Sequence, residues 1–417
     1  MKYKAVNNWL VYGILLLGLS VLFLQSCNKD DDTISPEIVL PLDPDGYLVQ
    51  GEKLDMVSKN IIQLAMDAAG YPDFKSYVQY SINVYKITYK TTFKDETILV
   101  SGLLVYPANY NYPMTTMIVG NGLTFADRDA PSSFRIPDNF TGFEFLAALG
   151  YLTLIPDMIG FGASKDQLFP IHNYQYSAGT MIDFIYAVDE FVEAKGLQVN
   201  DTKFLTGYSQ GAYIALSTLK MIEEKPVDDI RIRATAIGAG GYNIVSILND
   251  ALDKNTYTAP SHLILLFDSY NDIYQWNRPM TDFFQEPYAG RIPTLLNGDY
   301  DRLQINDQLA YSFDSLFNPV FLNNLKTGNE PDIIDAFEEN SIDNWAPVGR
   351  LNLIHSINDD RISYKDSEDT YNLMVSNGAD SVIYTPTETF GHINAAFDFV
   401  QEALSWFNEI EYKNESY

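Results

Sequence analysis

Two spacings of apolar residues alternate along most of the chain. Short continuous apolar runs are typical of buried strands, whereas apolar residues three and four positions apart indicate the buried face of a helix. The strand pattern occurs at residues 80–91, 96–106, 115–120, 151–156, 203–206, 231–237, 351–355 and 381–384. The helical pattern occurs at residues 52–69, 143–149, 176–194, 210–224 and 395–407. The sequence therefore predicts an α/β protein in which strands and helices alternate.

This alternation predicts a mostly parallel, twisted sheet with helices on both faces, because helices carry the chain back between parallel strands. Only residues 92–95 separate the first two strands, so these strands are expected to form a hairpin that adds an antiparallel edge. Residues 250–345 interrupt the alternation with several short helices, for example 304–317 and 331–339. We interpret this stretch as a helical cap, or lid, inserted into a core made of residues 48–249 and 346–417.

The first residues of the chain predict export. Lys2 and Lys4 precede an apolar run at residues 9–24, which is typical of a secretory signal peptide. The run ends in Leu24-Gln25-Ser26-Cys27, which resembles the lipobox of a bacterial lipoprotein. The resemblance implies that residues 1–26 are removed and that Cys27 is acylated. An ordinary signal peptide or a membrane anchor is the alternative.

The residues after Cys27 are polar and lead into the core. We interpret residues 27–47 as a flexible tether, because prolines and acidic residues are frequent there. The lysine and three aspartates at residues 29–32 resemble a surface-export tag, although short acidic runs are often only solvated spacers. The expectation is an outer-membrane lipoprotein that is exposed at the cell surface and held to the membrane by its lipid.

The chain is strongly acidic: its 417 residues carry a formal net charge of −28 at pH 7. Nucleic-acid-binding proteins present basic surfaces, so no nucleic-acid partner is expected, and strongly anionic substrates are disfavoured. The single cysteine excludes a disulfide framework within the chain. Residues 297–301 begin like an EF-hand loop, but Arg302 and Gln308 stand where Gly and Glu are needed. We expect a polar turn there, and neither a metal site nor a cofactor.

A serine stands in a G-x-S-x-G motif, Gly207-Tyr208-Ser209-Gln210-Gly211, between an apolar strand and an amphipathic helix. A turn this tight is expected to hold the serine at positive φ and to project its hydroxyl above the sheet. Gly207 and Gly211 omit side chains that would collide with the neighbouring backbone. Ser209 is therefore the candidate nucleophile of this nucleophile elbow. A glycine-rich turn without catalysis is the alternative.

A nucleophilic serine needs a base and a carboxylate that orients the base. After an elbow of this kind, the acid and then the histidine follow in the chain. His392 is the candidate base, because it lies in a loop after a strand, where active sites of open α/β sheets are found. Asp359 and Asp360 are the two candidate acids, because both follow a predicted strand between Ser209 and His392. Of the other histidines, His355 is expected to pack near the site, while His262 and His172 are interpreted as structural, with His172 able to line the pocket.

An oxyanion hole needs two N–H donors. One is expected from the backbone of Gln210, at the N-terminus of the helix after Ser209. The second is expected from the loop Asn121-Gly122-Leu123-Thr124, through the backbone N–H of Leu123 or Thr124.

These motifs together resemble the α/β-hydrolase superfamily and, within it, the secretory-lipase-like esterases of bacteria and fungi. Further marks of the resemblance are Val100-Ser101-Gly102-Leu103-Leu104, the run at residues 155–164, and Trp345-Ala346-Pro347 before the acid-bearing strand. The resemblance implies serine-dependent hydrolysis of a small-molecule carboxylic ester by Ser209, Asp359 and His392, with no cofactor. Two other hypotheses are a serine peptidase of the same superfamily acting on short peptides and a non-catalytic surface-binding lipoprotein.

Overall fold

A nine-stranded sheet runs through the computed structural model, which describes residues 45–68, 72–136, 139, 141–225 and 230–412. In chain order the strands are β1 Leu48–Val57, β2 Ile82–Phe93, β3 Glu96–Pro107, β4 Met114–Gly120, β5 Leu152–Pro156, β6 Val199–Tyr208, β7 Ile232–Gly238, β8 Leu351–Ser356 and β9 Val382–Thr387. They lie in the order β1-β2-β3-β5-β4-β6-β7-β8-β9.

The sheet is antiparallel at one edge and parallel elsewhere. The pairs β1–β2, β2–β3 and β3–β5 are antiparallel, and the five pairs from β5 through β4 and β6 to β9 are parallel. Lys94 and Asp95 form the turn of the predicted hairpin, both at positive φ, as a tight two-residue hairpin turn requires. The predicted mostly parallel sheet with an antiparallel edge is confirmed.

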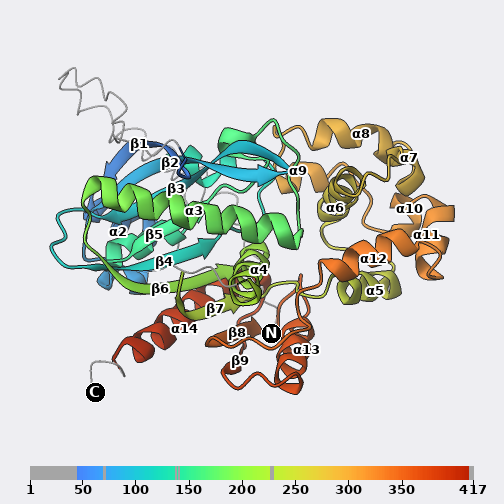
Figure 1. Cartoon of the computed structure of the whole chain (residues 1–417). Coiled ribbons are helices and arrows are strands. Elements are labelled where there is room, and N and C mark those ends of the chain that lie inside the picture. The colour runs from blue at the N-terminus through green and yellow to red at the C-terminus, as the bar shows by residue number, and fades with distance from the viewer. Residues whose placement is uncertain (1–44, 69–71, 137–138, 140, 226–229, 413–417) are drawn as a thin grey trace, which may run out of the picture. The chain divides into compact units, whose positions relative to one another are not determined.

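Helices cover both faces of the sheet (Figure 1). The helices of the core are α2 Lys59–Ala68, α3 Tyr174–Lys195, α4 Gln210–Glu224, α13 Tyr364–Ser376 and α14 His392–Tyr412. Short 3-10 helices are η2 Pro72–Ser76, η3 Asp127–Asp129, η4 Pro131–Ser133, η5 Phe143–Leu149 and η6 Gly162–Ser164.

Successive residues of a strand face opposite sides of the sheet and so enter different cores. In β4, Ile118 belongs to the cluster that includes α3 and α4, while Met117 and Val119 belong to the cluster that includes α14. All three side chains are buried, which explains why the sequence shows a continuous apolar run and not alternation.

Eight helices lie between β7 and β8 in the described residues: α5 Ile244–Lys254, α6 Pro260–Ile273, α7 Met280–Phe283, α8 Tyr288–Leu295, α9 Arg302–Asn306, α10 Phe313–Leu316, α11 Pro319–Lys326 and α12 Pro331–Glu339. We call this segment the cap. Figure 1 shows these helices gathered at one end of the sheet. Residue 250, where the sequence suggested that the cap begins, falls inside α5. A cluster of phenylalanines around the fully buried Phe267 forms the interior of the cap.

Two predicted helices were wrong in their extent. Residues 52–69 were expected to form one helix, but residues up to Val57 belong to β1, which pairs with β2, and the helix begins at Lys59. An edge strand followed at once by a short helix happened to give helical spacing across the junction. Residues 304–317 were expected to form one helix. The helix is interrupted by a turn between Asp307 and Ser312, so the stretch contains parts of two short helices, α9 and α10. Asp301 starts α9 with a capping box, so residues 297–301 form the polar turn expected there.

The expectations about export fall on residues for which the structure gives no description. Cys27, residues 1–26 and most of the tether at 27–47 lie outside the described residues. At the end of that stretch, the Tyr47 N–H donates to Glu190 of α3 (2.9 Å), and the Tyr47 ring stacks on Tyr186. The chain is therefore already docked on α3 one residue before β1 begins.

Candidate active site

Ser209 occupies a strained turn between β6 and α4. Its φ is 58° and its ψ is −125°, a conformation that costs a non-glycine residue free energy. An ideal Cβ on Gly207 would lie 2.1 Å from the Gly211 carbonyl oxygen, so the strand and helix meet backbone to backbone. The positive φ and the glycine requirement predicted for the elbow are both present.

The Ser209 hydroxyl is the first group in a chain of hydrogen bonds. Ser209 Oγ lies 2.9 Å from His392 Nε2, and His392 Nδ1 lies 2.7 Å from Asp359 Oδ2. Ser209 follows β6, Asp359 follows β8, and His392 follows β9 as the first residue of α14. The three residues meet because the carboxyl ends of parallel strands share one edge of the sheet.

Asp359 is held as a buried carboxylate. Its Oδ1 accepts the backbone N–H groups of Arg361 (2.8 Å) and Ile362 (3.0 Å). Burial by itself would raise the pKa of Asp359. The nearby His355 ring, the hydrogen bond from His392 and its charge, and the Arg361 N–H hold that pKa well below its ordinary value. The side chain therefore stays ionised and accepts a hydrogen bond from His392 Nδ1.

Asp360 contacts a different atom of the same histidine. Its Oδ1 accepts the backbone N–H of His392 at 2.9 Å. Tyr208, the second residue of the motif, donates its hydroxyl to the His392 carbonyl oxygen at 2.6 Å. The sequence indicated neither contact. Together they fix the backbone of His392 on both sides, and its side chain is almost fully buried.

The remaining histidines surround this site. His355 Nε2 lies 3.4 Å from Asp359 Oδ2, and its Nδ1 lies 2.8 Å from Ser367 Oγ, so it packs near the site as expected. His172 lines the cavity, and burial lowers its pKa to about 4. His262 lines the same cavity and stacks on Phe125, which the sequence did not indicate.

The cavity beside Ser209 has a volume of about 630 Å³. The loop residues Asn121, Gly122, Leu123 and Thr124 line it together with Gln210. Its other lining residues come from elements far apart in the sequence. Apolar residues come from α2, η5 and α14 (Met66, Phe143, Phe145, Phe397 and Val400), and further residues come from the cap (Tyr257, His262 and Arg302) and from the loop after β8 (Arg361 and Ile362). Sequence reasoning missed these residues. Arg361 could have been found, because it lies two residues after Asp359.

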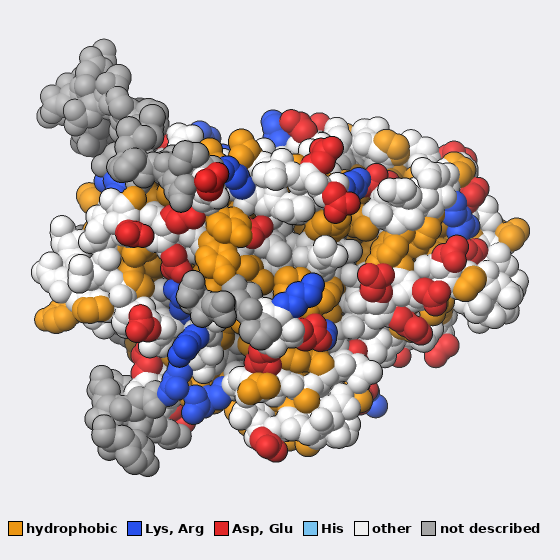
Figure 2. Space-filling view, viewed as in Figure 1, with side chains coloured by type: hydrophobic (Ala, Val, Ile, Leu, Met, Phe, Trp, Pro, Cys, Tyr) orange, Lys and Arg blue, Asp and Glu red, His pale blue; other side chains and the backbone are white. Residues whose placement is uncertain are grey.

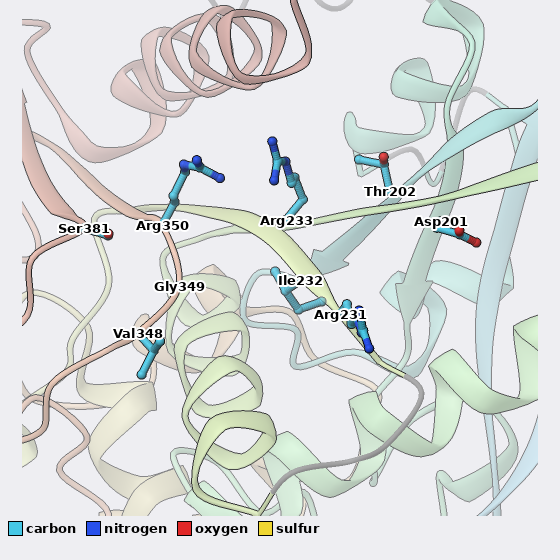
Figure 3. Close-up of a pocket in the computed structure, with 9 residues that line it drawn as sticks. All are labelled: Asp201, Thr202, Arg231, Ile232, Arg233, Val348, Gly349, Arg350 and Ser381. Carbon is cyan, nitrogen blue, oxygen red and sulfur yellow. The ribbon is translucent and has the colours of Figure 1, made fainter. Parts of the chain in front are cut away.

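A second cavity, of about 690 Å³, lies at the other ends of the strands (Figure 3). Arg231, Arg233 and Arg350 line it near the starts of β7 and β8, and Figure 3 shows the Arg233 and Arg350 side chains next to each other. Apart from these arginines it is lined by Asp201, Thr202, Ile232, Val348, Gly349 and Ser381. The elbow and the His392 loop lie at the opposite ends of the strands, so the two cavities are separate.

The described residues hold no group of three or more His, Cys, Asp or Glu side chains that could bind a metal ion. Within the same residues, no helix combines the length and the apolar character needed to cross a membrane. Acidic side chains are spread over the face seen in Figure 2, in keeping with the net charge of −28.

Solved structures from two bacteria and a fungus are similar to this fold. A candidate hydrolase from Legionella pneumophila superposes with a TM-score of 0.80 at 23% identity, over 88% of this chain and 98% of its own. The rice cell wall degrading esterase LipA from Xanthomonas oryzae gives 0.72 at 21% identity, over 86% and 95%. Candida antarctica lipase A in its closed state gives 0.64 at 14% identity, over 88% and 82%. At these identities the likeness establishes the α/β-hydrolase fold.

Sequence comparison is more specific. No curated protein sequence matches the chain. The family model for secretory lipases matches residues 140–415, more than half of the chain, including the elbow and the His392 loop. With its α/β-hydrolase fold, the protein therefore belongs to the secretory lipase family, lipase-like hydrolases that act on esters.

Proposed function

We propose that this protein is a serine esterase that cleaves carboxylic esters through an acyl-enzyme on Ser209. The observation that carries the proposal is the hydrogen-bonded chain from Ser209 through His392 to Asp359, set in the wall of a cavity. A serine hydroxyl is a weak nucleophile at neutral pH, and a base within hydrogen-bond reach, oriented by a carboxylate, is the arrangement that activates it.

The proposed reaction has two halves. In the first, His392 Nε2 accepts the hydroxyl proton as Ser209 Oγ bonds to the carbonyl carbon of the ester. Asp359 keeps the hydrogen on Nδ1 and stabilises the imidazolium. The tetrahedral intermediate then expels the alcohol, which takes the proton from Nε2. In the second half, a water gives its proton to Nε2 and attacks the acyl carbon, and the carboxylic acid leaves as Ser209 regains its proton.

We assign the oxyanion to the backbone N–H of Gln210 and to that of Leu123 or Thr124. Gln210 is the first residue of α4, so its N–H lies at the positive end of the helix dipole. The loop that carries Leu123 and Thr124 lines the same cavity as Ser209. Donors of this kind lower the barrier because they face the charge that develops in the transition state.

The test compares purified protein with Ser209→Ala on p-nitrophenyl esters of several chain lengths and on peptide p-nitroanilides. Ester turnover should fall by about 10⁴-fold or more in the variant, since removal of the nucleophile leaves only binding and oxyanion stabilisation. A fluorophosphonate should label only the parent protein. Amide turnover without ester turnover would instead indicate the peptidase, and absence of both turnover and labelling would indicate a non-catalytic binding protein.

We further propose that the enzyme is a lipoprotein of the bacterial outer membrane, exposed at the cell surface and anchored through Cys27. Membership of a secretory family supports export, and the lipobox-like residues 24–27 with the acidic run after them support the anchor. Cys27→Ser should abolish labelling by a palmitate analogue and release the protein from membranes, whereas Ser26→Ala, which keeps a small residue before the cysteine, should retain both. Membrane association unchanged in Cys27→Ser would contradict the anchor, and protection from protease added to intact cells would contradict surface exposure.

A further inference from the structure

Two arginines from distant parts of the chain line the cavity beside Ser209. Arg302 is the first residue of α9 in the cap, and Arg361 follows Asp359 by two residues in the core. Both side chains are partly buried. Both residues therefore line the same cavity, Arg302 from the cap and Arg361 from the core.

Neither guanidinium group forms an ion pair or a hydrogen bond with a described residue. The acids next to them in the chain have other partners. Asp301 caps α9 through Oδ1, and its Oδ2 lies 3.3 Å from Arg128. Asp360 accepts the backbone N–H of His392, and Asp359 binds the His392 ring and accepts the backbone N–H of Arg361, not its guanidinium group. Within the part of the chain that the structure describes, neither cation is thus in direct contact with a counter-charge.

The two arginines also repel each other. Burial and then the charge of Arg361 lower the pKa of Arg302. Bringing like charges together in a partly desolvated site costs free energy, and a bound anion would offset that cost. A cavity that contains two such groups is therefore favourable to a negatively charged ligand.

His262 adds an uncharged polar group to this side of the cavity. Its Nε2 is buried and has no hydrogen-bond partner among the described residues. Burial, followed by the charges of His172 and Arg302, lowers the pKa of His262 to about 3, so the ring is neutral at physiological pH. Among the described residues, Asp129 is the acid that lines the cavity, and one of its carboxylate oxygens lies 3.8 Å from Arg128. We call Arg302, Arg361 and His262 the polar wall.

The wall formed by α2, η5 and α14 is different in character. Met66, Phe143, Phe145, Phe397 and Val400 present apolar surface there, with no charged side chain among the lining residues of those three elements. Ser209 lines the cavity together with both walls. An ester bound at Ser209 can therefore place one end on each wall.

We propose that the natural substrate is an anionic, amphiphilic ester, with a carboxylate or phosphate bound by Arg302 and Arg361 and an apolar group against Met66, Phe143 and Phe397. The inference rests on the proposed esterase activity at Ser209. The net charge of −28 disfavours anionic substrates for the molecule as a whole. Binding at Ser209 depends more strongly on the charges that line the cavity, and those of Arg302 and Arg361 are positive.

The test uses pairs of esters that differ only in charge. In one pair the alcohol side varies: 4-carboxyphenyl butyrate against 4-carbamoylphenyl butyrate. In the other the acid side varies: phenyl hydrogen adipate against its terminal amide. We expect kcat/KM to favour the anionic member of at least one pair, and the pair identifies the side that faces the arginines. The preference should weaken as salt concentration rises, because charge attraction in a partly exposed site is screened.

Arg302→Gln and Arg361→Gln should each reduce the ratio of anionic to neutral kcat/KM by about 10-fold, in line with the loss of one charge-assisted contact in a partly exposed site. Arg233→Gln is the matched control. It removes the same charge from a partly buried arginine of the second cavity and should leave the ratio unchanged (Figure 3).

The outcomes separate the inference from the proposed function. Turnover of both esters without an anionic preference, or a ratio that neither arginine variant changes, would overturn the inference and leave the esterase intact. If no ester is hydrolysed, the proposed function fails. The polar wall is then tested by calorimetric binding of 4-butanamidobenzoate and 4-butanamidobenzamide to the Ser209→Ala protein. Tighter binding of the anion, lost in Arg302→Gln, would support the inference, and equal binding would overturn it.

Discussion

Two neighbouring carboxylates contact His392 at different atoms. Asp359 binds the imidazole nitrogen, whereas Asp360 accepts the backbone N–H. The first contact sets the hydrogen on Nδ1 and leaves Nε2 free to accept a proton, and the second only positions the start of α14. Replacement of each acid by asparagine should therefore affect kcat to different extents.

Asp359→Asn should lower kcat by about 10⁴-fold, because an amide neither stabilises the imidazolium nor enforces the same tautomer. Asp360→Asn keeps an oxygen that can accept the His392 N–H, so a loss below about 10-fold is expected, in line with a single neutral hydrogen bond. Steady-state kinetics on one p-nitrophenyl ester measures both. Equal losses in the two variants would contradict the division of roles.

Among the individual residues of the site, the sequence predicted those that directly follow a strand and missed those that reach the cavity through the packing of the cap. Ser209 and His392 stand in recognisable positions after strands, so their meeting follows from the topology of a parallel sheet. Asp359 and Asp360 are identical neighbours, so the sequence does not show which side chain reaches the His392 ring. That depends on the path of the loop after β8. Arg302 lies almost a hundred residues from Ser209 and reaches the cavity only through the packing of the cap.

The elbow depends on three elements meeting through their backbones. Gly120 at the end of β4 pairs with Gly207 of β6, and an ideal Cβ on Gly120 would lie 2.1 Å from the carbonyl oxygen of Gly211 in α4. A side chain there cannot be accommodated by a rotamer change, because the obstacle is backbone. The close approach positions both Ser209 and the loop after β4.

Gly120→Ala should destabilise the fold by about 3 kcal/mol or more, which lies at the upper end of overpacking costs, since strand and helix must separate. Gly122→Ala is the control two residues away, where an added Cβ meets nothing within 4 Å. Urea denaturation of both variants measures the effect. A Gly120→Ala protein as stable as Gly122→Ala would show that the backbone contact is unimportant.

Strands whose two faces are both covered by helices gave a clear sequence signal. The strands β4, β5 and β7 read as apolar runs because both of their faces are covered. The edge strand β1 was missed, since one side of it is exposed and its spacing merged with that of α2. The antiparallel strands β2 and β3, which have a paired strand on each side, were predicted over almost their full length.

For the molecule as a whole, stability is coupled to pH through a buried carboxyl group in α13. Asp366 accepts the backbone N–H groups of Tyr242 (2.8 Å) and Asn243 (3.4 Å), where the chain leaves the core for the cap. Burial raises the pKa of Asp366 from 3.8 to about 7, against the opposing effect of these hydrogen bonds. Between these values the folded protein binds a proton that the unfolded chain has released.

The stabilisation from Asp366 is thus complete below about pH 4 and is lost as pH rises through about 7, with a slope of up to about 1.4 kcal/mol per pH unit. Asp366→Asn removes this dependence, so the stability difference between parent and variant should shrink as pH rises from 4 to 7. Urea denaturation across that range measures it. Glu402→Gln, at an exposed position of α14, should follow the parent curve. A constant difference between the parent and Asp366→Asn would contradict the coupling.

The cap is one uninterrupted segment that leaves the core after β7 and returns before β8. Every group assigned to bond making and breaking lies outside it, whereas the polar wall combines Arg302 from the cap with Arg361 from the core. Part of the polar wall, Arg302 and His262, is therefore encoded in a different stretch of the gene from the groups assigned to the chemistry. A relative could acquire a new substrate by exchanging the cap alone, and its reaction mechanism would be inherited unchanged.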